Sequence, residues 1–418
     1  MLERVPLMVK EASSYEEYAG ADAVEELRAL AEPFRGAKVL HINATAFGGG
    51  VAELLGSVVP LMRDLGLEAE WQVLHGSDEF FNVTKGMHNA LQGAEIPWTW
   101  EMQETYLERL RENALALEGD WDFVIIHDPQ PAALLAFVEE GATNRRTPGS
   151  KWIWRCHIDL TDANQTVWEF LRPYVERHDA SVWTMPEFVP GTLDMERVRI
   201  IPPAIDPTAV KNLPLDRPFV QEIVRQYGVD LHRPIMCQVS RFDPWKDPVG
   251  VIEAFRIARK EVPGLQLLLA GSMATDDPEG FHYWEVTEQA RADDHDIFMV
   301  SNIQQVGSVQ INAFQRAADI VVQKSIREGF GLTVSEALWK ARPVIGGDCG
   351  GITIQIREGV DGYLVDSVEE CAKRTVELLL NPERADAMGA KGREHVRERF
   401  LTTRLLADWL RLFQEVSG

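Results

Sequence analysis

Cysteine is scarce in this chain, and its spacing argues against the sites that cysteine usually builds. There are four cysteines among 418 residues, at positions 156, 237, 349 and 371, and no two of them form a CxxC pair. Cys156 and Cys237 fall in apolar segments, where a free thiol behaves as a small hydrophobic side chain. We therefore expect neither a zinc site nor a disulfide framework.

Positive charge is also in short supply. The chain has 42 Lys and Arg residues against 65 Asp and Glu residues, which gives a net charge of −23. Nonspecific binding to nucleic acid or to an anionic membrane depends on many Lys and Arg contacts. We expect no nucleic-acid partner and no membrane partner, and an anionic substrate would need cations that are concentrated locally.

Long apolar runs are missing as well. No window approaches the ~20 consecutive apolar residues of a membrane-spanning helix. The N-terminus, MLERVP, lacks the basic start and following apolar stretch of a secretory signal. The sequence therefore predicts a cytoplasmic protein.

The length and the alternation of segments predict two α/β domains. A chain of 418 residues exceeds the ~250–300 residues at which one core stops growing. Apolar runs bounded by turn residues alternate with helical patterns, which is typical of doubly wound parallel sheets. Strands are predicted at 38–43, 69–74, 123–127, 152–157 and 181–184, and then at 235–239, 265–270, 297–300, 320–323, 343–345 and 363–365. The two halves, 1–205 and 206–400, meet after Pro202 and Pro203, which disfavour a helix.

The segment from Glu328 to Glu336 (EGFGLTVSE) follows a predicted strand and opens a predicted helix. Glycines at 329 and 331 let the backbone come close to a ligand, and the first amides of a helix suit a phosphate. We expect Gly331 and the amides of Leu332, Thr333 and Val334 to bind an anion. Two simpler interpretations stay open: Thr333 and Glu336 could form a capping box, and Glu328 could belong to an exposed ion pair of little consequence.

A second candidate anion site, Ser240 to Lys246 (SRFDPWK), directly follows the apolar strand 235–239. Such a loop lies at the carboxyl end of a strand, the edge where open α/β sheets bind ligands. Arg241 and Lys246 could hold a diphosphate there. The alternative is a solvated loop with two unrelated cations.

The N-terminal half carries a glycine-rich loop of its own, Gly48 to Gly50, between a strand and a helix. The spacing is not GxGxxG, and the next strand ends in His75 and Gly76 with no acidic residue for a ribose. A nicotinamide oxidoreductase is therefore disfavoured. A tight strand-to-helix turn is the structural alternative for this loop.

Two further polar residues follow predicted strands of the first half. His157 comes at the end of the strand 152–157, and Asp128 directly follows the strand 123–127. A single histidine in such a position is more often structural, and Asp128 could simply cap the next helix. The carboxyl edge of the sheet makes both of them candidates for ligand contacts.

Taken together, SRFDPWK and EGFGLTVSE resemble the donor site of retaining GT-B glycosyltransferases. The segments HINATAFGGG (41–50), WRCHID (154–159) and PAID (203–206) narrow the resemblance to trehalose glycosyltransferring synthases. The resemblance implies two Rossmann-like domains whose parallel sheets face an interdomain cleft. It also implies that a C-terminal helix, 401–418, crosses back onto the first domain.

The resemblance further implies an activity, its substrates and the roles of the site residues. A nucleotide-glucose (UDP, ADP or GDP) would donate glucose to free glucose with retention, giving α,α-trehalose. No metal is required in such enzymes and no Asp-x-Asp motif follows a strand, although Mg²⁺ can accompany the nucleotide; a homodimer is left open. The implied site is catalytic at His157 and Glu328, donor-binding at Arg241, Lys246, Glu336, Gly331, Leu332, Thr333, Gly49 and Gly50, and acceptor-binding at Asp128 and Asn43.

Two rival functions share this pattern. A trehalose phosphorylase would use inorganic phosphate in place of a nucleotide, so that Glu336 would have no ribose to hold. A noncatalytic sugar-nucleotide sensor could use the same fold. Such a sensor has no need for His157 and Glu328 beside the reacting carbon, which disfavours it.

Overall fold

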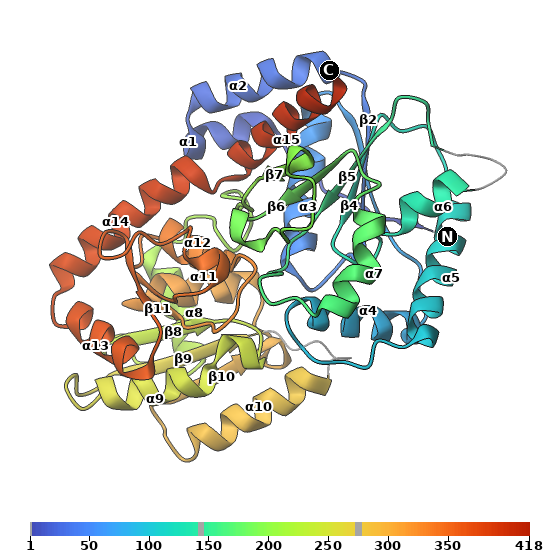
Figure 1. The fold of residues 1–418 in the computed structure, drawn as a ribbon. Coiled ribbons are helices and arrows are strands. Elements are labelled where there is room, and N and C mark those ends of the chain that lie inside the picture. Colours follow the sequence, from blue (N-terminus) through green and yellow to red (C-terminus); the bar gives the residue numbers. More distant parts are fainter. Residues whose placement is uncertain (1, 141–145, 272–277) are drawn as a thin grey trace. The chain divides into compact units, whose positions relative to one another are not determined.

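The computed structural model describes residues 2–140, 146–271 and 278–418 and divides the chain into two compact units. Unit 1 comprises Met1–Ala204 and Thr402–Gly418, and unit 2 comprises Ile205–Leu401 (Figure 1). Each predicted domain boundary lies one residue from an observed one. Each unit holds one sheet, so the predicted fold class, two Rossmann-like α/β domains, is confirmed.

Unit 1 is built on a seven-stranded sheet in the order β1-β3-β2-β4-β5-β6-β7. Its strands are β1 (Glu3–Arg4), β2 (Lys38–Asn43), β3 (Glu68–Val73), β4 (Phe123–His127), β5 (Lys151–Arg155), β6 (Ala180–Trp183) and β7 (Val198–Ile200). The prediction of a wholly parallel sheet is wrong at one edge, because β1 pairs antiparallel with β3. With only two residues, β1 has no alternation to read, and the three-residue β7 was missed for the same reason.

Helices cover both faces of this sheet. One face packs on α2 (Ala21–Ala31), α3 (Gly50–Asp64) and α15 (Thr402–Ser417), with the short α1 (Glu16–Ala19) beside α2. The second group of helices comprises α4 (Asp78–Leu91), α5 (Trp100–Ala116), α6 (Leu134–Glu140) and α7 (Gln165–Val175), which pack on one another (Figure 1).

The C-terminal helix α15 belongs to the core of unit 1, as its grouping with that unit shows. Leu405, Leu406, Trp409, Leu410 and Phe413 are all buried in the same cluster as the strands. The Phe413 ring stacks on Phe123 of β4, with centroids 4.2 Å apart. This helix therefore completes a hydrophobic core that residues 1–204 begin.

Unit 2 contains a six-stranded sheet, parallel throughout, in the order β10-β9-β8-β11-β12-β13. The strands are β8 (Ile235–Val239), β9 (Gln266–Gly271), β10 (Ile297–Ser301), β11 (Ile320–Gln323), β12 (Val344–Gly347) and β13 (Gly362–Val365). All predicted strands of both units match observed ones to within two residues at each end.

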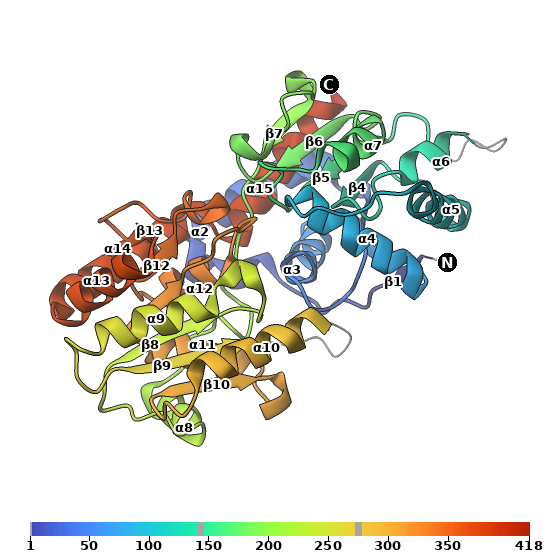
Figure 2. The ribbon, with the colours of Figure 1, turned by 60° about the horizontal axis from the view of Figure 1, so that its bottom comes forward.

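The helices of unit 2 also form two groups. On one face lie α9 (Pro248–Ala258), α10 (Pro278–Arg291) and α13 (Val368–Leu379), with α9 and α10 side by side in Figure 2. The others are α8 (Arg217–Gln226), α11 (Ser308–Ala317), α12 (Leu332–Trp339) and α14 (Pro382–Arg399); α8 packs on α11, and α12 on α14.

The strand order reverses direction at one point in each sheet. In unit 1 this point lies between β2 and β4, and in unit 2 between β8 and β11. At such a point the connections that follow the two neighbouring strands run to opposite faces of the sheet, so the two loops diverge and leave room for a ligand at the carboxyl edge. We therefore expect ligand-binding residues in the loops after β2, β4, β8 and β11.

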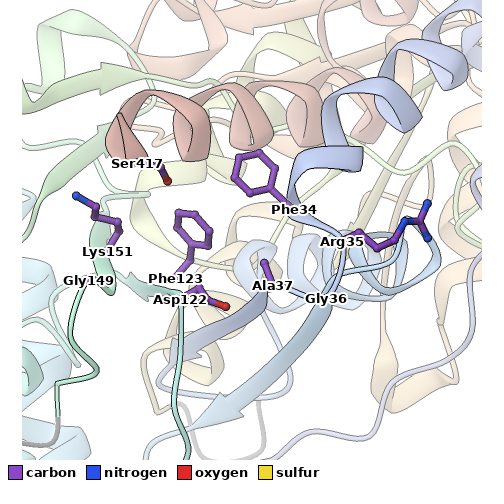
Figure 3. Close-up of a pocket in the computed structure, with 9 residues that line it drawn as sticks. All are labelled: Phe34, Arg35, Gly36, Ala37, Asp122, Phe123, Gly149, Lys151 and Ser417. Atoms are coloured by element: carbon purple, nitrogen blue, oxygen red, sulfur yellow. The ribbon is translucent and has the colours of Figure 1, made fainter.

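A pocket of unit 1 lies at the opposite edge of the sheet. It has a volume of about 430 Å³ and sits where β2, β4 and β5 begin (Figure 3). Its lining consists of Phe34, Arg35, Gly36, Ala37, Asp122, Phe123, Gly149, Lys151 and Ser417. None of the predicted site residues is among them.

None of the described helices combines the length and the apolar composition that a membrane-spanning segment needs.

Candidate functional site

The loop after β8 is folded tightly by local contacts. Gly271 at the end of β9 allows this approach, because a Cβ there would lie 2.3 Å from the Ser240 carbonyl oxygen. Asp243 accepts a hydrogen bond from the Lys246 amide at 3.1 Å, and the Lys246 carbonyl accepts one from Gln238 at 2.7 Å. Asp247, with φ +46°, then caps α9. The position of Lys246 is thus fixed by its own backbone.

The loop after β11 ends in a left-handed glycine. Gly331 has φ +81° and is the N-cap of α12. A Cβ at this position would also lie 3.1 Å from the Glu328 side chain, so glycine serves both the backbone and the space. The Glu328 carbonyl accepts a hydrogen bond from the Gly351 amide at 3.1 Å, which ties this loop to the one after β12.

These two loops, which we call the paired loops (240–247 and 324–331), are bound to each other by four contacts. The Ile326 amide donates to the Trp245 carbonyl at 2.8 Å, and Lys246 Nζ lies 2.5 Å from Glu328 Oε2. Lys324 forms an ion pair with Asp247, and the Arg327 guanidinium lies over the Trp245 ring. The structure therefore joins two motifs that are about ninety residues apart in the sequence.

The charged side chains of the paired loops differ in how far they are exposed to solvent. The side chains of Lys246 and Glu328 are only 13% and 12% exposed, whereas Arg241 is 61% exposed and lies 3.2 Å from Asp243. The interpretation of Glu328 as an exposed ion-pair partner is wrong, because its partner is Lys246 and both are largely buried. Lys246 is a largely buried cation held by Glu328, and Arg241 is an exposed one on the same loop.

The first turn of α12 corrects part of the predicted anion site. The Val334 amide donates to the Gly331 carbonyl at 2.9 Å, so it is not free for a phosphate as predicted. Leu332 and Thr333 remain as first-turn amides, for which the described residues supply no acceptor. The capping box is also absent, because Gly331 is the N-cap and makes no side-chain hydrogen bond.

Glu336 lies one turn inside α12 and is only 1% exposed. Its Oε1 is 3.0 Å from Lys211 Nζ, and its buried Oε2 has no hydrogen-bond partner in the described residues. Lys340, one turn further, donates to the Glu336 carbonyl at 3.0 Å, and burial lowers the pKa of Lys340 to about 7. A buried carboxylate oxygen without a hydrogen-bond donor lowers the stability of the folded state, so a bound group that donates to Oε2 would be favoured.

Two residues of this region were not predicted from the sequence. Lys211 is brought to Glu336 across 125 residues, and no local pattern marks it. Gln355 is fully buried and binds the start of α12: it accepts from Ser335 Oγ at 2.5 Å and donates to the carbonyls of Phe330 and Gly351. A glutamine shortly after the glycines at 350 and 351 does not by itself indicate a role, and the contacts of Gln355 with α12 are seen only in the structure.

In unit 1 the glycine loop after β2 is exposed and open. Gly48 has φ +79°, Gly49 is the N-cap of α3, and Gly50 is its first residue. Asn43 fixes the start of the loop: its amide group donates to the Thr45 carbonyl at 2.7 Å and accepts from Trp71 at 2.7 Å. These contacts give Asn43 a structural role, while its contact with an acceptor sugar stays a prediction.

Asp128 follows β4 in a left-handed conformation, with φ +67°. Its Oδ1 accepts a hydrogen bond from the His157 amide at 2.8 Å. Since the next helix, α6, begins only at Leu134, the interpretation of Asp128 as a helix cap is wrong. Burial raises the pKa of Asp128 to about 7, against the opposing effects of this hydrogen bond and of Arg155. The carboxyl group is therefore poised between its two protonation states near neutral pH.

His157 was predicted to be the last residue of a strand, but it lies two residues beyond the end of β5. It is half-buried, and its Nε2 is 2.9 Å from His127 Nδ1, whose own Nε2 is 3.0 Å from His41 Nδ1. His157 is therefore not a lone histidine. Among the described residues, no group of three or more His, Cys, Asp or Glu side chains is arranged to hold a metal ion.

The raised pKa of Asp128 generates a prediction for stability. Because the folded state holds a proton up to about pH 7 and an unfolded Asp only up to about pH 3.9, this group makes the protein less stable as the pH rises through that window, by at most about 1.4 kcal/mol per pH unit. Asp128→Asn keeps the left-handed turn and the acceptor for His157 but cannot ionise. Denaturant titrations should show that the stability of the variant relative to wild type increases from pH 4 to pH 8.

Asp120→Asn, which changes an exposed carboxylate, is the matched control and should show no such trend. A constant difference between wild type and Asp128→Asn across this pH range would contradict the prediction.

Comparison with known proteins gives full-length matches. Residues 41–190 match the family model "Trehalose synthase, N-terminal domain", and residues 219–395 match "Glycosyl transferases group 1". The chain is 51% identical to a trehalose synthase of Rubrobacter xylanophilus over 100% of both chains. It is 45% identical to one of Pyrococcus horikoshii over 98% of this chain and 99% of that one.

More distant matches concern a phosphorylase and a solved fold. A trehalose phosphorylase of Grifola frondosa is 26% identical over 97% of this chain and 61% of its own length. The solved structure of a UDP-forming α,α-trehalose-phosphate synthase from Burkholderia vietnamiensis superposes with a TM-score of 0.70 at 14% identity, covering 92% of this chain and 98% of that one. The chain therefore belongs to the trehalose synthase family of GT-B glycosyltransferases, and it is an enzyme of trehalose-related glycosyl transfer.

Proposed function

We propose that this enzyme transfers glucose from a nucleotide-glucose to free glucose, with retention of configuration, and so forms α,α-trehalose. One observation carries the proposal: at the order reversal of the unit 2 sheet, the paired loops hold a largely buried cation, Lys246, against the carboxylate of Glu328, and they carry an exposed cation, Arg241, on the same loop as Lys246. Cations and a helix N-terminus at this edge suit a diphosphate leaving group.

The charges assign a role to each residue of the paired loops. Negative charge grows on the departing diphosphate, and Lys246, Arg241 and the amides of Leu332 and Thr333 stabilise it. Lys246 is already oriented by Glu328, so little reorganisation is needed during the reaction. Glu328, which directly precedes the glycine loop, positions the glucosyl ring.

Glu336 is proposed to hold the ribose hydroxyls of the nucleotide. Its unpaired Oε2 supports this role, because a hydroxyl donor would complete a carboxylate that is otherwise half-satisfied. The side chain is only 1% exposed, so contact with a ribose requires the Lys211 side chain to move. Lys211 is 19% exposed and can make that movement.

For unit 1 we keep the roles that the resemblance implies. Gly49 and Gly50 contact the donor phosphates, His157 contacts the transferred sugar near C6, and Asp128 and Asn43 bind the acceptor glucose. A front-face displacement, in which the leaving phosphate takes the proton of the acceptor hydroxyl, is the mechanism proposed. The positive charge comes from Lys246, Arg241 and α12, and any Mg²⁺ enters with the nucleotide.

The first test is the product. With UDP-glucose and glucose the enzyme should release UDP and α,α-trehalose, identified by chromatography and by the anomeric signals in NMR spectra; ADP-glucose and GDP-glucose test the base. UDP is the first nucleotide to test, because the fold is shared with a UDP-forming enzyme. Trehalose cleavage by inorganic phosphate alone, with release of glucose 1-phosphate, would instead establish the phosphorylase. Nucleotide binding without any product would establish the sensor.

The cations of the loop after β8 generate a second test. Lys246→Ala and Arg241→Ala should each lower kcat by about 10² or more, the scale for losing one oriented donor to developing charge. The control is Lys260→Ala, which removes an exposed lysine just beyond the other end of α9. Circular dichroism checks the fold of all three variants. Wild-type kcat in either loop variant would remove this loop from the diphosphate site.

Glu336 generates a third test. Glu336→Gln keeps the shape but removes the charge, and hydrogen bonds to a charged group contribute ~1.5–3 kcal/mol. Calorimetric titration should therefore show UDP binding weakened by about 10-fold or more, at least as strongly as turnover, whereas Glu328→Gln should reduce kcat more than UDP affinity.

Glu370→Gln is the matched control, because Glu370 lies in a partly exposed ion pair with Arg374 on α13. Unchanged UDP affinity in Glu336→Gln would reject the ribose contact and favour phosphate over a nucleotide donor.

A further inference from the structure

Three histidines form a diagonal ladder across neighbouring strands of unit 1. His41 of β2 pairs with Ile125, two residues before His127 of β4, and His127 pairs with Arg155, two residues before His157. Since side chains two residues apart share a face of a strand, the three histidines lie on one face, each one step nearer to the carboxyl edge. This is the face covered by α3 and α15.

The rings of the ladder are stacked and joined by hydrogen bonds. His41 and His127 have centroids 5.3 Å apart, as do His127 and His157. The bonds join His41 Nδ1 to His127 Nε2 at 3.0 Å and His127 Nδ1 to His157 Nε2 at 2.9 Å. Each link therefore uses Nδ1 of one ring and Nε2 of the next, which leaves two ends: His157 Nδ1 at the edge and His41 Nε2 inside.

The inner end of the ladder faces a small cavity that offers it no partner. His41 Nε2 is buried without a hydrogen bond, and the cavity is lined mainly by apolar side chains of α3 and α15, among them Leu55 and Trp409. Arg155, 2% exposed, lines the same cavity. Burial lowers the pKa of His41 to about 3 and lowers those of His127 and His157 as well, so all three rings are neutral.

Neutral rings allow only two consistent proton arrangements, because each imidazole carries one N–H. In the first, every ring is protonated on Nδ1, His41 donates to His127, His127 donates to His157, and His157 presents an N–H at the edge. In the second, every ring is protonated on Nε2, the donors run the other way, and His157 Nδ1 is a bare acceptor. The second arrangement also leaves a buried N–H of His41 without an acceptor.

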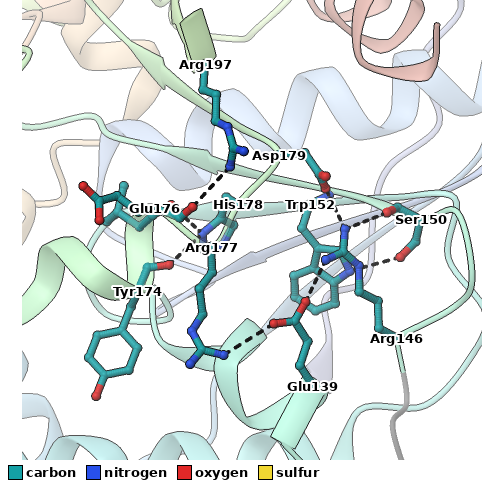
Figure 4. Close-up of polar contacts among 11 residues, drawn as sticks. Glu139, Arg146, Ser150, Trp152, Tyr174, Glu176, Arg177, His178, Asp179 and Arg197 are labelled. Atoms are coloured by element: carbon teal, nitrogen blue, oxygen red, sulfur yellow. Dashed lines mark hydrogen bonds and ion pairs between the residues drawn. The ribbon is translucent and has the colours of Figure 1, made fainter. Parts of the chain in front are cut away.

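The cavity favours the first arrangement. Orphaned buried N–H groups are rarer in proteins than under-satisfied acceptors, so the unpartnered His41 Nε2 is better left as a bare nitrogen than as an N–H. The same chain gives a parallel in His178 (Figure 4), whose Nδ1 lies 3.1 Å and 3.2 Å from the carbonyls of Tyr174 and Val175. Carbonyls only accept, so His178 is an Nδ1–H tautomer, and its buried Nε2 is likewise unpaired.

We propose that His41 and His127 are positioning residues that lock His157 in the Nδ1–H tautomer, so that His157 offers a neutral N–H donor to an oxygen of the bound sugar or phosphate. The identity of that oxygen rests on the proposed function; the lock itself does not. His157 cannot release its outer proton and stay neutral unless His41 Nε2 takes one up, and no described group donates a hydrogen bond to that nitrogen. His157 therefore donates a hydrogen bond and does not act as a base.

The direct test is NMR of the enzyme with ¹⁵N-labelled histidine rings. Two-bond ¹H–¹⁵N correlations distinguish Nδ1–H from Nε2–H rings, and His178 is the internal reference for the first. We expect His41, His127 and His157 to share the pattern of His178, with assignments made by single substitution. An Nε2–H pattern for His157, or a mixture of the two tautomers, would overturn the lock.

Variants separate the lock from a merely structural role. His41→Asn retains an N–H donor at the position of Nδ1, whereas His41→Leu removes it. The leucine variant should show mixed tautomers of His157 and a fall of about tenfold in kcat, the scale of one hydrogen bond, with the donor KM unchanged; the asparagine variant should restore both. His178→Asn is the control for changing a buried histidine.

Equal kcat and an unmixed His157 spectrum in His41→Leu would overturn the role of His41. The spectrum also keeps this test apart from the proposed function: a locked His157 whose replacement by leucine leaves turnover unchanged would confirm the lock and reject the ligand contact.

Discussion

The candidate site of unit 2 depends on the pairing of β8 with β11 at the order reversal of the sheet. That pairing places two strand ends side by side, and each strand continues into a loop whose largely buried charges are paired with charges of the other loop. Lys246 and Glu328 satisfy each other at 2.5 Å, and Lys324 and Asp247 form a second pair. Removing one member would leave the other as a largely buried, uncompensated charge, so the buried side chains of each loop depend on the other loop for their charge balance.

Two glycines and Gln355 fix the position of the first turn of α12 relative to the paired loops. A Cβ at Gly351 would lie 2.4 Å from the Phe330 backbone, and one at Gly347 would lie 1.9 Å from the Ser325 carbonyl oxygen. The loops after β11 and β12 are therefore packed backbone to backbone. Gln355 binds carbonyls of both loops and accepts from Ser335 on α12. The direction of the Leu332 and Thr333 amides is thus fixed by contacts that Gln355 makes with both loops and with α12.

Sequence reasoning succeeded where the signal is local and failed where it is not. Buried strands such as Ile235–Val239 and Ile320–Gln323 are mostly apolar segments with one glutamine each, and their bounds were predicted to the residue. The two residues of β1 carry no such pattern. Gly331 was singled out because glycine lets the backbone come close to a ligand, whereas its positive φ at the start of α12 is seen only in the structure. The bonding of the Val334 amide depends on how tightly the first turn closes. Lys211 joins Glu336 only through the folding of unit 2.

The histidine ladder shows why strand register matters as much as composition. His41, His127 and His157 were visible in the sequence as separate residues, each near a strand end. A slip of one residue in the pairing of β2 with β4, or of β4 with β5, would move one ring to the opposite face and break the chain of hydrogen bonds. Buried polar groups that satisfy one another only in one register make that register the stable one. The ladder therefore specifies the sheet on which it lies, and the sheet in turn fixes the orientation of His157 at its edge.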